Sequence, residues 1–235
     1  MTAAPAGDSE LARFAARDPA GFIRANTTLT APSLVPEVRL HLADEAMDLW
    51  ARTEDVLETV GLPPPYWAFA WAGGQALARY LLDNPALVAG RRVLDFATGS
   101  GIVAVAALKC GAAHVLATEI DPFAREAARL NAAANGVEAG LTVSGEDMTA
   151  AAPGRFDIVL AGDVFYEKPM AERVGAWLMR ECAAGTVVLV GDPGRSYLPK
   201  EQLEPVAEFR VPVPRAIEDS EIKHTRIWRF RQPAA

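Results

Sequence analysis

The run at residues 93–101, VLDFATGSG, constrains the fold of this chain more than any other part of its sequence. A short apolar strand pattern ends in an acid, and a loop of small residues follows at once. A helical pattern comes next, and then a second apolar run, VLATEIDP at 115–122, which also ends in acids. Parallel strands joined by a helix present their carboxyl ends at one edge of a sheet. The order therefore predicts a pocket for a nucleoside cofactor at that edge.

Strand and helix patterns alternate through the middle of the chain. The predicted strands cover residues 92–96, 114–118, 140–144, 156–161 and 186–191. The predicted helices cover residues 75–82, 101–109, 122–135 and 168–182. This alternation is typical of an α/β fold, with a mostly parallel sheet and helices on both faces. The strand-like segments 206–213 and 224–231 predict a closing antiparallel hairpin at the end of the chain.

The first part of the chain lacks this alternation. We predict an N-terminal helical extension over residues 1–60 and a catalytic core over residues 61–235, with the proline-rich stretch GLPPP at 61–65 as the junction. Within the extension, a short helix is expected over residues 10–17. A second helical pattern carries the apolar residues Leu40, Leu42, Ala46, Leu49 and Trp50.

Composition excludes several classes of protein. The formal net charge of −7 and the pI near 5.1 argue against a nucleic-acid binder, which needs a basic face. Two cysteines and three scattered histidines do not make a disulfide framework or a metal site, so no metal is expected. No apolar run reaches the ~18 residues that a membrane span needs. The N-terminus lacks a secretory pattern, so a cytoplasmic protein is expected, and the alanine- and arginine-rich composition favours a bacterial source.

The loop after the first predicted strand is suited to close contact with a ligand. Small residues at Ala97, Gly99 and Gly101 remove side chains from the path of the ligand. The helix that follows points its free amide groups into the same space. The loop has no Lys-Ser/Thr pair, so it is not the phosphate loop of a nucleoside triphosphatase. Its alternate spacing also differs from the dinucleotide pattern G-x-G-x-x-G.

Three acids lie where they could serve the ligand or the fold. Glu119 ends the second strand and can accept hydrogen bonds from both ribose hydroxyls. Asp121 precedes Pro122 and is interpreted as the cap of the next helix. Asp147 follows the third strand, where it can bind an adenine amino group or remain a solvated loop acid.

A second group of residues is predicted to face the reacting end of the cofactor. Asp163 and Tyr166 follow the fourth strand, within the run DVFYE at 163–167. A carboxylate and an aromatic wall suit a flexible amine, because one orients it and the other removes it from water. Trp71, beside Gly73, lies in an aromatic-rich segment just before the first strand and is expected to line the methionine end of the cofactor. A core position under a helix is the alternative for these aromatic residues.

Together these parts resemble the class I S-adenosylmethionine-dependent methyltransferases. Ala97 departs from their pattern, since most members carry glycine there. The aromatic segment, the run at 163–167 and the run GDPGR at 191–195 are similar to one family in particular, the electron transfer flavoprotein beta subunit lysine methyltransferases. The resemblance extends from about Phe22 to about Phe230.

This resemblance implies a Rossmann-like seven-stranded sheet and N-methylation of lysine side chains on the electron transfer flavoprotein beta subunit. The methyl donor would be S-adenosyl-L-methionine, leaving S-adenosyl-L-homocysteine. Catalysis is expected of Asp163 and Tyr166. Cofactor binding is expected of Trp71, Gly73, Asp95, Ala97, Thr98, Gly99, Gly101, Glu119, Ile120, Asp147, Met148 and Gly162.

Other functions remain open at this point. The same chemistry could act on a lysine of a ribosomal protein, or on a small amine such as nicotinamide. A module that binds the cofactor without catalysis is disfavoured by the intact Asp163 and Tyr166. A nicotinamide-dependent oxidoreductase is disfavoured by the spacing of the loop at 97–101.

Overall fold

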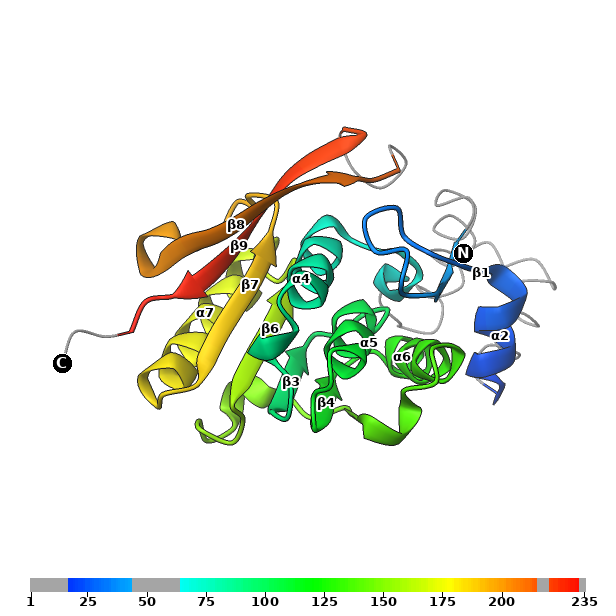
Figure 1. Ribbon diagram of the computed structural model, residues 1–235, viewed down its shortest axis with the longest axis horizontal. Coiled ribbons are helices and arrows are strands. Elements are labelled where there is room, and N and C mark those ends of the chain that lie inside the picture. The colour runs from blue at the N-terminus through cyan, green and yellow to red at the C-terminus, as the bar shows by residue number, and fades with distance from the viewer. Residues whose placement is uncertain (1–16, 44–63, 215–219, 233–235) are drawn as a thin grey trace, which may run out of the picture.

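The computed structural model describes residues 17–43, 64–214 and 220–232. Its main feature is a seven-stranded sheet in the order β5-β4-β3-β6-β7-β9-β8 (Figure 1). The strands are β3 (Arg92–Phe96), β4 (His114–Thr118), β5 (Leu141–Ser144), β6 (Ile158–Gly162), β7 (Val187–Asp192), β8 (Leu203–Pro212) and β9 (Ile222–Phe230). The first five pair in parallel, and β9 pairs antiparallel with both β7 and β8.

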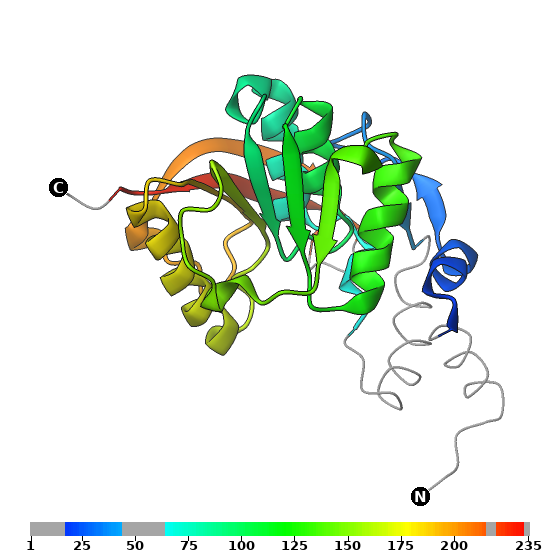
Figure 2. The same ribbon diagram turned by 90° about the horizontal axis from the view of Figure 1, so that it is seen from below.

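Helices cover both faces of this sheet (Figures 1 and 2). The helices of the sheet domain are α4 (Ala72–Asp83), α5 (Ile102–Lys109), α6 (Pro122–Ala134) and α7 (Lys168–Ala183). Short 3-10 helices are η1 (Tyr66–Ala68), η2 (Pro85–Leu87), η3 (Glu138–Gly140), η4 (Met148–Ala150) and η5 (Lys200–Gln202). No helix among the described residues is long and apolar enough to cross a membrane.

The hydrophobic core is divided into two layers by the sheet. Neighbouring residues on β3 point to opposite faces, so Val93 packs in the layer under α4 and α5, and Leu94 packs in the layer under α7. Both side chains are fully buried. A strand that is buried on both faces needs a continuous apolar sequence, which is the pattern that the predicted strands show.

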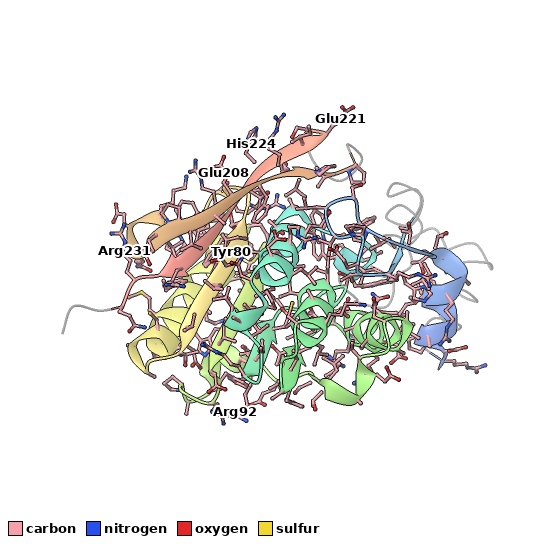
Figure 3. The ribbon with its side chains drawn as sticks, viewed as in Figure 1. Tyr80, Arg92, Glu208, Glu221, His224 and Arg231 are labelled. Atoms are coloured by element: carbon pink, nitrogen blue, oxygen red, sulfur yellow. The ribbon has the colours of Figure 1, made fainter. Side chains whose placement is uncertain are left out.

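The sheet places three strand ends side by side. Strand β3 lies between β4 and β6, with Asp95 in register with Ala117 on one side and Leu160 on the other. The chain therefore runs outward from β3 in both directions, which makes this edge the topological switch point of the sheet. Arg92 begins β3 and marks the opposite edge, away from this switch point (Figure 3).

The strands predicted from the sequence patterns are confirmed. All seven strands form at the expected places, and the last two make the expected antiparallel hairpin. Helix α4 begins at Ala72, three residues before the predicted start at residue 75. Two glycines near its start have low helix propensity, but the packing of this end against the sheet outweighs that preference.

The prediction for the N-terminal part is wrong where the structure describes it. Residues Leu40–Leu42 form strand β2, which pairs antiparallel with β1 (Thr28–Thr30), instead of beginning a helix. A helix that sequence patterns did not indicate, α2 (Pro19–Asn26), precedes this strand pair. The predicted helix at 10–17, except its last residue, lies outside the described residues, as do the rest of the second helical pattern and most of the junction at 61–65.

The described N-terminal residues pack directly against the sheet domain. The ring of Phe22 on α2 meets Phe123 on α6 edge to face, with 5.7 Å between centroids. The buried Asn131 side chain on α6 accepts from the backbone N–H of His41 at 2.7 Å and donates to the Ser100 carbonyl at 2.7 Å. The boundary at residue 60 stays a prediction.

Candidate active site

A cavity of about 460 Å³ opens at the switch point of the sheet. This volume lies in the usual range for small-molecule sites. The walls come from the loop after β3, the ends of β4 and β6, the start of α4 and the loop after β7. Nine of the predicted site residues line it: Trp71, Ala97, Gly99, Glu119, Ile120, Asp147, Gly162, Asp163 and Tyr166. Five others, Gly73, Asp95, Thr98, Gly101 and Met148, do not line it.

The loop after β3 adopts backbone angles that favour glycine. Ala97 and Gly99 both have φ of +52°, and Gly101 has φ of +80° where α5 begins. Nothing lies within 4 Å of a Cβ built on Gly99, so the space beside it is open to a ligand. The methyl group of Ala97, the departure from the family pattern, is therefore accommodated in a left-handed conformation at the cavity wall.

Asp95 lies behind this loop. Its carboxylate accepts from the Thr98 hydroxyl at 2.5 Å and from the Ala104 amide at 3.0 Å. Complete burial raises the pKa of Asp95 to about 7. Asp95 thus joins the loop to the first turn of α5 from inside the core.

Glu119 extends from the end of β4 into the cavity. It accepts from the backbone amides of Gly99 and Asp121, both at 3.2 Å, and burial raises its pKa. Ile120 beside it is 73% exposed and forms an apolar part of the wall. A carboxylate next to an apolar surface and an open glycine loop fits a nucleoside, which has a diol and a flat base. Asp121 caps α6 as predicted, accepting from Phe123 N at 2.8 Å.

Asp147 and Met148 differ in their placement. Asp147 is exposed at the cavity, where its carboxylate accepts from the backbone amide and the hydroxyl of Thr149 at 3.0 and 2.6 Å. The Thr149 hydroxyl lowers the pKa of Asp147. Met148 is fully buried in the core under α7. Of this pair, only Asp147 reaches the cavity.

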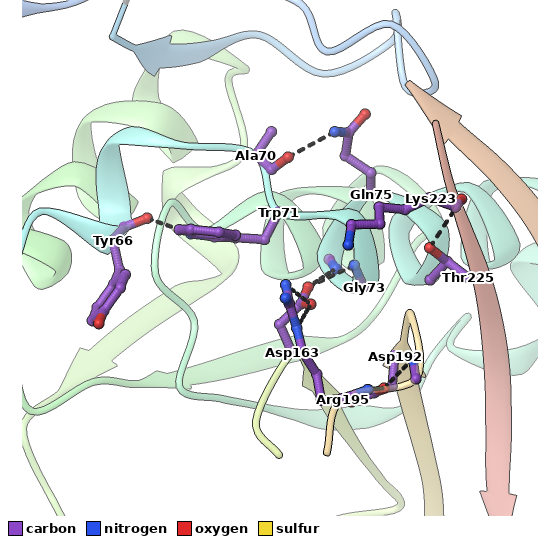
Figure 4. Close-up of polar contacts among 12 residues, drawn as sticks. Tyr66, Ala70, Trp71, Gly73, Gln75, Asp163, Asp192, Arg195, Lys223 and Thr225 are labelled. Atoms are coloured by element: carbon purple, nitrogen blue, oxygen red, sulfur yellow. Dashed lines mark hydrogen bonds and ion pairs between the residues drawn. The ribbon is translucent and has the colours of Figure 1, made fainter. Parts of the chain in front are cut away.

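Asp163 is held by two elements at once (Figure 4). One oxygen of its carboxylate accepts from the amides of Gly73 and Gly74, at 2.5 and 3.2 Å, at the start of α4. The other accepts from Arg195 Nε and an Arg195 terminal nitrogen, at 3.1 and 2.8 Å. The backbone φ of Asp163 is +56°, a conformation that is uncommon for residues other than glycine. Such strain at a buried acid marks a candidate functional position.

The loop after β7 supplies a second buried acid. Asp192 accepts from the amides of Gly194 and Arg195 at 2.6 and 2.7 Å, which sets the direction of the loop. Burial raises the pKa of Asp192 to about 6, and the nearby charge of Asp163 contributes in the same direction. Arg195 forms an ion pair with Asp163 at 2.8 Å, and its positive charge also acts to lower the pKa of Asp192.

Three aromatic side chains form a wall next to Asp163. The Tyr66 ring lies 5.9 Å from the Trp71 ring and 5.9 Å from the Tyr166 ring, between centroids. The Trp71 indole donates to the Tyr66 carbonyl at 2.9 Å (Figure 4). Burial raises the pKa of Tyr166 to about 12, so its phenol stays protonated at neutral pH. The wall is therefore uncharged and suited to a cation or an amine.

Gly73 contributes to this site through backbone packing. A Cβ built there would lie 2.2 Å from the Gly191 carbonyl oxygen and 2.5 Å from the Asp163 carboxylate. A Cβ on Gly162 would lie 3.0 Å from Gly74. The glycines thus allow the start of α4 to reach the ends of β6 and β7.

Thirteen residues that line the cavity were not predicted as site residues, and four of them bear on its chemistry. These four are Tyr66, Met170, Arg173 and Arg195. Arg195 belongs to the run at 191–195, and Tyr66 to the aromatic-rich segment, so both had a visible signal. Among the described residues, no three His, Cys, Asp or Glu side chains are arranged to hold a metal.

The fold and this site define a class I methyltransferase, an enzyme class that uses S-adenosylmethionine as methyl donor. The model of the ribosomal protein L11 methyltransferase family (PrmA) matches residues 76–164, which span the cofactor loop and the β6 end. A protein from Pyrococcus horikoshii, proposed to be an RNA methyltransferase, has a TM-score of 0.52 at 17% identity, over 68% of this chain and 83% of its own. That likeness shows the fold alone.

The chain belongs to the electron transfer flavoprotein beta subunit lysine methyltransferase family. The Xenopus laevis member is 39% identical over 223 residues, which covers 93% of this chain and 89% of the relative. The human member is 35% identical over 217 residues, covering 89% and 81%. The resemblance seen in the motifs is confirmed over nearly the whole chain.

The expected cytoplasmic location and bacterial source are corrected by the same comparison. Relatives that match about nine-tenths of the chain include proteins from frog, mouse and human. The alanine and arginine content was therefore a poor guide to the source.

Proposed function

We propose that this protein transfers methyl groups from S-adenosylmethionine to lysine side chains of the electron transfer flavoprotein beta subunit. One observation carries the proposal most strongly: a single cavity joins a wall suited to a nucleoside with an aromatic wall beside Asp163. The full-length relatives bear the name of this activity, which supports the choice of substrate.

The residues that would hold the cofactor follow the cavity from one end to the other. Glu119 would accept the ribose hydroxyls, while Ile120 would cover one face of the adenine. Asp147 would accept from the adenine amino group, since it reaches the same end of the cavity. The loop at 97–99 and Trp71 would line the path toward the methionine end.

When bound, the cofactor supplies a methyl group attached to a positively charged sulfur. That methyl group would pass to the lysine nitrogen, with the electrons of the broken carbon–sulfur bond remaining on sulfur. The amine must be neutral to use its lone pair, and its surplus proton leaves to water after transfer. This chain would supply orientation through Asp163 and exclusion of water through Tyr66 and Tyr166.

Mass spectrometry with a heavy-methyl cofactor tests the proposal. Purified enzyme is incubated with the electron transfer flavoprotein beta subunit, and peptides are searched for labelled lysine. Asp163→Ala is expected to lower the rate by about 100-fold, because misplacement of reacting groups has effects of this size. The matched control is Asp157→Ala, an exposed acid that pairs with Arg92 at the opposite edge of the sheet and is expected to keep full activity. If calorimetry shows that the enzyme binds the cofactor but the subunit remains unlabelled, the substrate assignment is wrong.

A lysine of ribosomal protein L11 is the second candidate acceptor. The L11 methyltransferase of Geobacter sulfurreducens is 42% identical over 100 residues, but that covers 43% of this chain and 32% of the relative. The match is confined to part of the chain, so it favours a shared cofactor site more than a shared substrate. The same labelling experiment with L11 as acceptor decides between them.

A further inference from the structure

Two buried acids lie next to Arg195 at the end of the cavity formed by the aromatic wall, which we call the acceptor end. Asp163 is 8% exposed and Asp192 is 1% exposed. The Arg195 side chain lies 2.8 Å from the Asp163 carboxylate, and its backbone amide lies 2.7 Å from the Asp192 carboxylate (Figure 4). The guanidinium also lies 5.8 Å from the centre of the Trp71 ring. Arg195 thus joins the carboxylates to the aromatic wall.

The start of α4 adds positive charge on the other side of Asp163. The amides of Gly73 and Gly74 donate to one oxygen of the carboxylate, and Arg195 donates to the other. Free amides at a helix N-terminus carry a partial positive charge. Both oxygens of the Asp163 carboxylate therefore accept hydrogen bonds from groups that carry full or partial positive charge.

This arrangement meets a chemical requirement of the proposed reaction. A free lysine amine has a pKa near ~10.4 and is mostly protonated at neutral pH. A carboxylate without a counter-ion would stabilise the ammonium form further, because opposite charges favour ionisation. The ammonium form has no lone pair to attack the methyl group. A carboxylate that carries its own cation can orient the amine without holding its proton.

We propose that Arg195 is a positioning residue for methyl transfer, which offsets the charge of Asp163 and so keeps the acceptor amine in its neutral, nucleophilic form. The inference rests on the proposed function. It goes beyond that function because it assigns to Arg195 a role in the ionisation of the substrate, in addition to its structural contact. Asp192 acts through Arg195, since its carboxylate fixes the loop and adds the opposing negative charge.

Other charged and titratable groups face this part of the cavity. Among the described residues they are Asp192 on the β7 loop, Glu119 after β4, Tyr66 before α4, and Tyr166 and Glu167 after β6, while Arg173 on α7 lines the cavity near Asp147. The pKa of Tyr166, raised to about 12, prevents it from accepting the proton of the amine at neutral pH. Each variant replaces only one charged side chain, so a change in the pH profile of kcat reports the loss of that charge.

The test is the pH dependence of kcat from pH 6 to 10, with the electron transfer flavoprotein beta subunit as acceptor at saturating cofactor. The midpoint is the pH at which kcat reaches half of its maximum. Arg195→Gln is expected to move this midpoint upward by about one pH unit or more, the usual effect of removing a neighbouring charge. Activity should fall about tenfold at pH 7 and recover at high pH. Arg195→Lys keeps the positive charge and is therefore expected to keep the midpoint. Lysine cannot bind the carboxylate through two nitrogens as arginine does, so kcat itself is expected to fall.

Asp192→Asn is a second variant, for which the midpoint of the kcat profile is expected to shift in the opposite direction. It removes a negative charge while an amide oxygen can still accept from the loop amides, so the midpoint is expected to move downward. Calorimetry with S-adenosyl-L-homocysteine checks that each variant keeps a folded cofactor site. If Arg195→Gln lowers kcat equally at every pH and Asp192→Asn leaves the midpoint in place, Arg195 is only a structural contact. Absence of turnover in the wild type would instead overturn the proposed function.

Discussion

At the scale of single residues, two strand-end acids that look alike in sequence have different environments. Asp95 is 1% exposed and bonds only to its own loop and helix, as far as its hydrogen bonds are described. Glu119 reaches the cavity and remains accessible to a ligand. The difference arises because the loop after β3 folds back onto Asp95, whose carboxylate accepts from Thr98 and Ala104, whereas Glu119 lines the cavity. Burial therefore makes Asp95 a support for the loop, while Glu119 is available for recognition.

The raised pKa of Asp95 predicts a pH-dependent contribution to stability. The unfolded chain loses this proton near pH 4, but the folded protein keeps it until about pH 7. The contribution of Asp95 to the free energy of unfolding therefore falls as pH rises between these values, by up to about 1.4 kcal/mol per pH unit. Asp95→Asn keeps an oxygen that can accept from Thr98 and Ala104 but does not titrate.

Urea denaturation of both proteins at several values between pH 4.5 and 7 measures this effect. The stability of the Asn variant relative to wild type is expected to increase steadily with pH. Groups that do not interact with Asp95 titrate equally in both proteins and cancel in the comparison. A constant difference across this range would show that Asp95 is already ionised in the folded protein.

At the scale of elements, the start of α4 organises the acceptor end of the site. Its amides hold Asp163, and its first residues carry the aromatic wall toward the cavity. This contact requires a backbone-to-backbone approach between α4 and the ends of β6 and β7, which Gly73, Gly162 and Gly191 permit. The site therefore depends on how closely one helix docks on the sheet.

Gly73→Ala is predicted to disrupt that docking. The new methyl group would lie 2.2 Å from the Gly191 carbonyl oxygen, so helix and strand must separate. We expect a loss of about 3 kcal/mol in the free energy of unfolding, at the upper end for overpacking, together with a large loss of methyl transfer. Thermal and urea unfolding measure the first, and the labelling assay measures the second.

Gly175→Ala on α7 is the matched control. A Cβ there would make an ordinary contact at 3.8 Å with the Phe165 ring, and alanine favours the helix by up to about 1 kcal/mol. This variant should be as stable as wild type or slightly more stable, with its activity retained. Equal losses in the two variants would contradict a specific role for the α4 contact.

At the scale of the whole molecule, the described N-terminal residues form part of the sheet domain's packing. Helix α2 contacts α6 through a cluster that includes Phe22, Trp67 and Phe123, and Trp67 also lines the cavity. Asn131 connects β2 with the loop that follows β3 through its two hydrogen bonds. These contacts link the N-terminal residues to the loop after β3 and to a residue that lines the cavity.

Phe22→Ala tests whether these residues fold together with the sheet. Phe22 is 3% exposed, and truncation of a buried phenylalanine costs about 3 kcal/mol or more. We expect a single unfolding transition that shifts by this amount in urea. Met179→Ala, at a side chain 44% exposed on α7, is the control and should change stability by less than about 0.5 kcal/mol. An unchanged main transition would mean that residues 17–43 fold separately from the sheet.

The sequence by itself determined the sheet and its cofactor edge. Runs of apolar residues with turns between them encode buried strands, and this local signal extends without interruption from β3 to β7. The capping of α6 by Asp121 was also predictable, because a cap depends on neighbours within a few residues. The short strands β1 and β2 were not, since three residues carry too little periodicity to separate strand from helix.

Only the tertiary structure decided how the acids are used. Asp163, Asp192 and Arg195 are far apart from the start of α4 in sequence, and they meet because two parallel strands end beside one helix. No local pattern encodes which carboxylate receives a cation, which becomes buried and which faces the cavity. Burial and long-range contacts set the pKa values of these acids, so the chemistry of the site depends on the fold. The existence of the site, in contrast, was visible in the run at 93–101.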